Sequence, residues 1–138
     1  MANMKPLLRI VQWALLALLM NASPLYAEPL SPAARGEIEV LLSRLAASDC
    51  QFKRNGRWHT AVEAQVHLRR KLDYLVDKGA VASAEQFIER AASQSSMSGQ
   101  AYQVKCGSQA PAASGAWLRA ELQRLRAGTN KGGSKRAD

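Results

Sequence analysis

The chain has 138 residues, with 19 Lys and Arg against 11 Asp and Glu, and 47% of its residues are hydrophobic. This length allows one small domain with a real core and excludes an enzyme built from separate cofactor and substrate domains. The net charge of +8 raises the question of nucleic-acid binding, because an excess of Lys and Arg is what phosphate backbones select. The answer depends on where these charges lie along the chain.

The first 27 residues have the pattern of a secretory signal peptide. A short basic start precedes an apolar run from Ile10 to Met20, and a polar segment ends at Ala27. The apolar run is about half of the ~20 residues that a membrane-spanning helix needs. We therefore expect cleavage between Ala27 and Glu28, export to the periplasm and no permanent membrane span. An uncleaved amphipathic anchor is the alternative.

The end of the chain, residues 129–138, contains two adjacent glycines, three basic residues and no large apolar residue. Such a segment buries too little surface to offset its chain entropy, so we expect a disordered basic tail. This leaves residues 28–128 as a single domain. The signal peptide and the tail each carry two of the eight net charges, so the domain itself is only moderately basic. Together with export, this argues against nucleic acid as a partner.

The first element of the predicted domain is a helix from Ser31 to about Ala47. A serine hydroxyl can cap the free amide groups, and Pro32 lacks an N–H at a position where none is needed. One apolar stripe at helical spacing is expected to face the core, formed by Ile38, Leu41, Leu42 and Leu45.

A β-hairpin follows, with strands at Gln51–Arg54 and Arg57–Thr60. Asn55-Gly56 between them favours a type I′ turn, because both residues tolerate positive φ. The register of a two-residue turn places two cross-strand pairs on opposite faces of the sheet, Phe52 with His59 and Lys53 with Trp58.

The next helix begins with a capping box formed by Thr60 and Glu63, and it ends at about Lys78, before Gly79. Its predicted buried stripe consists of Ala61, Ala64, Leu68, Leu72 and Leu75. Further apolar residues on the same helix predict that it packs on two sides, namely Val62, Val66, Tyr74 and Val76.

Ser83 and Gln86 cap a third helix that runs to about Ala92, and a connecting loop rich in serine follows. Residues 101–106 alternate as a half-buried strand, and residues 107–113 form a loop. The last helix begins at Ser114 and buries Trp117, Leu118, Leu122 and Leu125. The order of these elements predicts an α+β fold, in which about four helices cover a small antiparallel sheet made of the hairpin and one later strand.

The two cysteines, Cys50 and Cys106, stand at the ends of predicted strands. In an exported chain they are expected to form one disulfide, which makes the two strands neighbours or near neighbours. The alternatives are two free thiols, an intermolecular bridge, or zinc bound by both cysteines with His59 and His67. The zinc alternative lacks the usual paired C-x₂₋₄-C spacing. We predict neither a metal nor a cofactor.

Four runs of sequence lie in order between Glu37 and Leu118: EIEVLLSRLAASDCQFKRNG, AVEAQVHLRRK, AEQFIERAASQSSMSGQAYQVKC and SGAWL. Together they resemble the YfeK-like family of small exported bacterial proteins, a domain of unknown function. The resemblance implies a periplasmic setting and a bond between Cys50 and Cys106. It brings no catalytic residues.

Basic side chains gather near an aromatic residue on the hairpin and the helix after it. These candidate binding residues are Lys53, Arg54, Arg57, Trp58, His59, Arg70 and Lys71. Such a cluster suits an anionic glycan, a phosphate-bearing envelope lipid or an acidic protein surface. The competing interpretation is a basic strand edge that blocks pairing between molecules. His67 adjoins Leu68, so we expect this histidine to be hydrogen-bonded and partly buried.

The sequence carries none of the familiar catalytic motifs: no nucleophile elbow, no phosphate-binding glycine loop and no helical pair of metal-binding histidines. We therefore predict a non-catalytic binding or envelope-support module of the periplasm, whose partner is an envelope protein or an anionic envelope ligand. The alternative is a small envelope-directed hydrolase with His59 or His67 as the base. It requires one of these histidines to lie in an open cleft beside a carboxylate.

Overall fold

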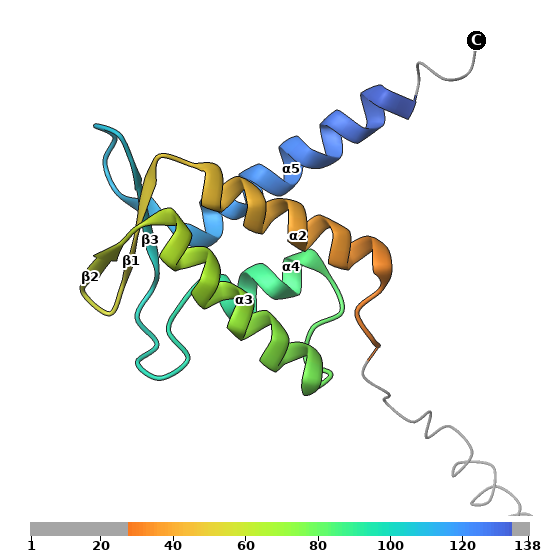
Figure 1. Cartoon of the computed structure of the whole chain (residues 1–138), viewed down its shortest axis with the longest axis horizontal. Helices are drawn as coiled ribbons and strands as arrows, with labels where there is room; N and C mark the ends of the chain where they lie inside the picture. The colour runs from red at the N-terminus through yellow and green to blue at the C-terminus, as the bar shows by residue number, and fades with distance from the viewer. Residues whose placement is uncertain (1–27, 134–138) are drawn as a thin grey trace, which may run out of the picture.

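The computed structural model describes residues 28–133. The predicted signal peptide and the last five residues of the chain lie outside this range. Figure 1 shows a layer of helices beside a small sheet. In chain order the elements are α2 (Pro32–Ala47), β1 (Cys50–Arg54), β2 (Arg57–His59), α3 (Ala61–Asp77), α4 (Ala84–Phe87), η2 (Ile88–Ala92), β3 (Gln103–Cys106), β4 (Ala112–Ala113) and α5 (Ser114–Gly133). None of these helices is long and apolar enough to cross a membrane.

The sheet is antiparallel, with the strand order β2-β1-β3-β4. Asn55 and Gly56 both have positive φ, at 48° and 80°, as the type I′ turn requires. Both predicted cross-strand pairs are present. Strand β4 was not predicted, because two residues are too short to show an alternating pattern.

A disulfide joins Cys50 to Cys106, which are register partners on neighbouring strands with their Cα atoms 4.2 Å apart. The bond confirms the predicted pairing and leaves neither thiolate for zinc. The two cysteines are 56 positions apart in the sequence. In the chain-entropy model, closing a loop of this length stabilises the fold by about 4 kcal/mol.

The hydrophobic core lies between the helices and one face of the sheet. Burial alternates along β1 and β3, so one face is covered and the other is exposed. The predicted stripe of α2 is fully buried, and so are Leu72 of α3 and Phe87 of α4. Phe52 of β1 meets the ring of Trp117 edge-on, with the ring centroids 5.7 Å apart, and this contact joins the sheet to α5.

Two helices differ from the prediction. The third helix changes to a π-helix at Ile88, and the wider turn places Ile88, Ala91 and Ala92 together in the core. Helix α5 extends to Gly133, so the expected disordered tail is wrong for its first five residues. Once a helix has formed, each added residue completes a backbone hydrogen bond without needing burial. The Thr129 hydroxyl also donates to the Arg126 carbonyl, at 2.8 Å.

Candidate functional site

The outer side of α3 is exposed, which corrects the prediction that this helix packs on two sides. The exposed fractions are 58% for Val62, 43% for Val66 and 61% for Tyr74. The inner stripe is buried against the core at Ala61, Leu68 and Leu72. Val76, the fourth residue predicted for the second side, is partly buried and packs against the core. Val62 and Val66 therefore lie at the protein surface, next to residues of the hairpin, and not in a packed interface.

A first groove is lined by residues of the hairpin and of α3, which follow each other directly in the chain. We call it the hairpin groove. Its volume is about 410 Å³, and it is lined by Arg54, His59, Val62, Glu63, Val66, His67 and Arg70.

A second groove lies on the other side of His67, between α3 and the loop that leads to β3. We call it the loop groove. Its volume is about 450 Å³, and it is lined by His67, Arg70, Lys71, Tyr74, Leu75, Arg90 and Ser96. His67 and Arg70 line both grooves and therefore form the boundary between them.

His67 is hydrogen-bonded, as predicted, with its Nε2 atom 3.1 Å from the Tyr102 hydroxyl. The Lys71 ammonium lies 3.4 Å from the same hydroxyl and can only donate to it. The Tyr102 O–H is then free to donate to an unprotonated Nε2. Burial, followed by the charges of Arg54, Lys71, Arg70 and His59, lowers the pKa of His67 to about 4. His67 is therefore neutral at pH 7.

Lys71 is a fixed cation rather than a free surface charge. Its Nζ atom donates to the Gln94 carbonyl at 3.1 Å and lies 5.1 Å from the centroid of the Tyr102 ring. Burial, and then the charge of Arg54, lowers the pKa of Lys71, while burial raises the pKa of Tyr102. The three side chains of Lys71, Tyr102 and His67 thus form one hydrogen-bonded unit beneath the grooves.

His59 has a carboxylate neighbour, because its Nδ1 atom lies 3.9 Å from Glu63 Oε2. That carboxylate already caps α3: the Thr60 backbone N–H donates to it at 2.8 Å. Hydrogen bonds from the Thr60 backbone and then from its hydroxyl lower the pKa of Glu63. Within residues 28–133, no group of three or more His, Cys, Asp and Glu side chains is placed to hold a metal ion.

The family described as "Family of unknown function (DUF5329)" matches residues 32–126. The chain belongs to this family. An uncharacterized protein, YfeK from Salmonella typhimurium, is 42% identical over 66 residues, which are 47% of this chain and 53% of the relative. The chain thus spans about half the length of this curated relative, and the predicted resemblance is confirmed. No solved structure matches the chain.

The DUF5329 match includes every residue of both grooves, but the family's description assigns no activity to them. Of the predicted binding residues, Arg54, His59, Arg70 and Lys71 come together around the two grooves. The other three lie elsewhere. Lys53 and Trp58 face each other on the exposed side of the sheet, with the ammonium 5.7 Å from the ring centroid. Arg57 is exposed at the end of the hairpin and lines neither groove.

Sequence reasoning missed Arg90, which reaches the loop groove from η2. Its guanidinium donates to the Ala80 carbonyl, which fixes the side chain beside α3. Arg90 lies about twenty positions after the helix residues that it joins, so no sequence spacing could place it there. The apolar residues Val62, Val66 and Tyr74 predict a second packing surface on this helix. In the DUF5329 domain they form an exposed apolar rim instead.

The cations of the grooves share one property. None of Arg54, Arg70, Lys71 and Arg90 lies within 4 Å of a carboxylate in the part of the chain that the structure describes. Elsewhere in the DUF5329 domain, Arg44 of α2, Arg69 of α3 and Arg126 of α5 are paired with glutamates. Some exposed cations away from the grooves, such as Arg35 and Lys105, also have no carboxylate within 4 Å in the described residues. The grooves therefore combine exposed apolar side chains with cations that make no ion pair within 4 Å in the described domain. The hairpin groove also contains one carboxylate, that of Glu63, whose pKa is lowered mainly by the hydrogen bonds from Thr60 and also by the charge of Arg54.

Proposed function

We propose that this chain is an exported, non-catalytic binding module of the periplasm, and that its binding surface is the outer side of α3 with its two grooves. The partner is an anionic molecule of the cell envelope. One observation carries the proposal: four cations without a carboxylate within 4 Å in the described domain gather around the grooves. Like charges held together repel each other, and an anionic partner relieves that repulsion.

Export is supported by the leader pattern of residues 1–27 and by the disulfide, because such bonds persist in oxidising compartments such as the periplasm. The hydrolase alternative has weaker support. His67 is hydrogen-bonded to a tyrosine rather than to a carboxylate, and the carboxylate beside His59 serves as a helix cap. A general base needs an acceptor that is free to take a proton from a bound substrate or water.

Photo-crosslinking inside a Gram-negative host tests the proposal. The chain, with its own leader, carries a photoreactive phenylalanine analogue in place of Val62. A matched control carries the analogue in place of Val40, an exposed valine of α2 with 37% of its surface exposed. We expect an adduct from position 62 only, formed on a chain that begins at Glu28, as measured by intact mass.

A further variant makes the test specific to charge. Replacing Arg54 and Arg70 by Glu reverses the two groove charges and should abolish the adduct from position 62, because an anionic partner is then repelled. Equal adducts from positions 62 and 40, or an adduct that survives the charge reversal, would show that the grooves are not the binding surface.

A further inference from the structure

The exposed side of α3 has an amphiphilic pattern. Val62, Val66, Arg70 and Tyr74 follow one another every four residues and therefore lie along one line of the helix surface. Each of these four side chains is exposed. Arg54 and Lys71 lie on the two sides of this line, in the hairpin groove and the loop groove. A line of exposed apolar side chains that includes one cation and has further cations beside it is typical of a surface that lies at the boundary between water and lipid.

A second element adds to the same surface. The Ser98 hydroxyl donates to Asn55 Oδ1 at 2.8 Å, so the loop before β3 is tied to the tip of the hairpin. This loop contributes Ser96 to the loop groove and carries Met97, whose side chain is 98% exposed. The loop before β3 thus adds one exposed apolar residue next to a residue of the loop groove.

We infer that the ligand of this surface is an anionic phospholipid in a membrane. The inference rests on the proposed function of the same face. The lipid phosphate would be held in the hairpin groove by Arg54 and Arg70, because a guanidinium binds phosphate oxygens in pairs. The glycerol and the upper acyl carbons would lie against Val62 and Val66, while the long basic side chains reach the headgroups.

Two other occupants fit the surface less well. A second copy of the chain would bring Arg54, Arg70 and Arg90 against the same cations, and such like-charge contacts are strongly unfavourable. An acidic protein would match the cations, but it gives no reason for a line of exposed valines with an exposed methionine nearby. A phospholipid bilayer supplies anionic and apolar groups at adjacent depths, in the arrangement that this surface presents.

Vesicle co-sedimentation tests the inference, using the protein purified from the periplasm after export. We expect binding to vesicles of equal parts phosphatidylglycerol and phosphatidylcholine, and no binding to phosphatidylcholine alone. Each basic residue at an anionic surface contributes about 1 kcal/mol, which is roughly a fivefold change in partitioning. The variant Arg54→Gln/Arg70→Gln should therefore bind about 25-fold more weakly.

The matched control is Arg35→Gln/Lys105→Gln, which removes the same charge from exposed residues of α2 and β3. Its partitioning should change less than about twofold, because these positions lie away from the grooves. Val62→Ser/Val66→Ser tests the apolar contact and should lower partitioning about fivefold. Serine and valine have similar helix propensities, so the fold is retained, and circular dichroism checks this.

The outcomes separate this inference from the proposed function. The lipid assignment would be overturned if Arg54→Gln/Arg70→Gln and the charge control lost vesicle partitioning equally. It would also be overturned if Val62→Ser/Val66→Ser bound vesicles as well as the wild type. So would inorganic phosphate or glycerol phosphate competing away all binding, because the ligand would then be a free phosphate compound. A protein adduct from position 62 that depends on Arg54 and Arg70, without vesicle binding, overturns the lipid and keeps the proposed function. The absence of both signals rejects both.

Discussion

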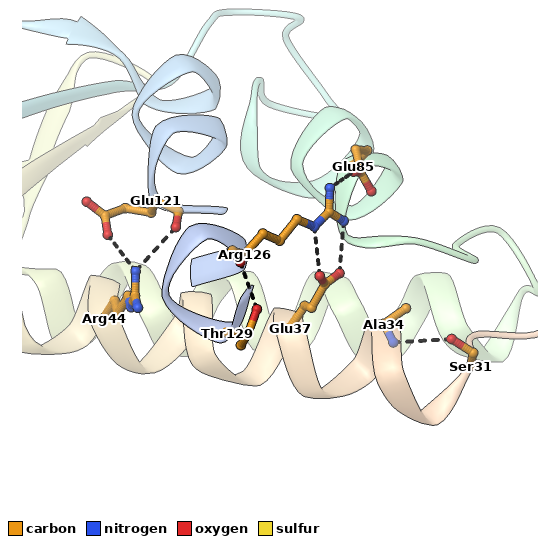
Figure 2. A network of polar contacts seen from close by, with 8 residues as sticks. All are labelled: Ser31, Ala34, Glu37, Arg44, Glu85, Glu121, Arg126 and Thr129. Atoms are coloured by element: carbon orange, nitrogen blue, oxygen red, sulfur yellow. Dashed lines mark hydrogen bonds and ion pairs between the residues drawn. The ribbon is translucent and has the colours of Figure 1, made fainter. Parts of the chain in front are cut away.

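Two surfaces of this domain use arginine in opposite ways. Where α5 meets α2 and α4, the Arg126 guanidinium donates to Glu37 at 2.8 and 3.0 Å and also reaches Glu85 (Figure 2). Arg44 of α2 binds the Glu121 carboxylate and the backbone carbonyl of the same residue. On the outer side of α3, by contrast, Arg54 and Arg70 have no carboxylate within 4 Å in the described domain.

The difference separates two roles of surface charge. The paired arginines join helices that are distant in the sequence, so their charges are neutralised within the fold. The arginines of the grooves do not hold any two elements together by an ion pair. Because an exposed ion pair contributes only about 0–1 kcal/mol, the domain does not need every arginine to be paired in order to be stable. Unpaired cations collected at one place are therefore better explained by a partner than by folding.

The largest expected effect concerns the two sides of α3. Leu72→Ala should lower the free energy of unfolding by about 3 kcal/mol, because Leu72 is fully buried and its truncation leaves a cavity. Val66→Ala, on the outer side of the same helix, should change it by no more than about 0.5 kcal/mol. Urea denaturation monitored by circular dichroism measures both. Similar losses for the two variants would mean that Val66 is covered after all, and the two-surface comparison would fail.

The second prediction concerns His67, which contributes to pH-dependent stability. In the unfolded chain a histidine binds a proton near pH 6.5, whereas in the fold the pKa of His67 is about 4. Between these values the unfolded state holds more protons, so the stability is fully present above pH 6.5 and is lost as the pH falls toward 4. Since solvent screens this partly exposed ring, we expect a loss of about 1 kcal/mol between pH 7 and pH 5.

The variant His67→Gln isolates this effect, because glutamine can still accept from the Tyr102 hydroxyl but does not titrate. Its thermal midpoint should fall less between pH 7 and pH 5 than that of the wild type. Two ion-paired carboxylates contribute little in this range, since hydrogen bonds from arginine lower the pKa of Glu39 and of Glu85. Their contributions are lost only as the pH falls through those lowered values. An identical pH slope in both proteins would show that His67 titrates normally in the fold.

Local chemistry made much of the fold predictable. The Asn55-Gly56 turn determines its own backbone geometry, and that geometry sets which residues of the hairpin face each other. The capping box of Thr60 and Glu63 fixes the start of α3 in the same way. The disulfide between Cys50 and Cys106 was also predictable, because the chain has only two cysteines and each stands at the end of a predicted strand. Each of these features depends on residues close in the sequence or on one covalent bond.

The candidate site was only half predictable, because it depends on which side of each element is covered. The alternation of side chains along the hairpin places Lys53 and Arg54 on opposite faces of the sheet. It does not predict which of the two faces the helices cover. The spacing of Val62 and Val66 was equally compatible with burial, and only the packing of α2 and the sheet leaves them exposed. Arg90 belongs to a π-helix, whose register no sequence periodicity revealed.

The smallest expected effect is the most direct comparison of the two surfaces. Arg126→Gln breaks the contacts of α5 with Glu37 and Glu85, so it should lower the free energy of unfolding by about 0.5–1 kcal/mol at low salt. Most of this loss should vanish at about 1 M salt, where screening acts over ~3 Å. Arg70→Gln should leave the stability unchanged or raise it slightly, because it relieves repulsion from neighbouring cations.

Urea denaturation at low and high salt measures both variants, and they are matched because each removes one charge from an exposed arginine in a helix. The sign of the change in unfolding free energy for Arg70→Gln decides between a structural role and a binding role for this residue. If the variant is as stable as the wild type, then Arg70 has been kept in a repulsive setting that folding does not require, and binding is the remaining reason for its position. If the variant is destabilised as much as Arg126→Gln, Arg70 is a structural residue, and the contrast between the paired and the unpaired surface no longer points to a ligand.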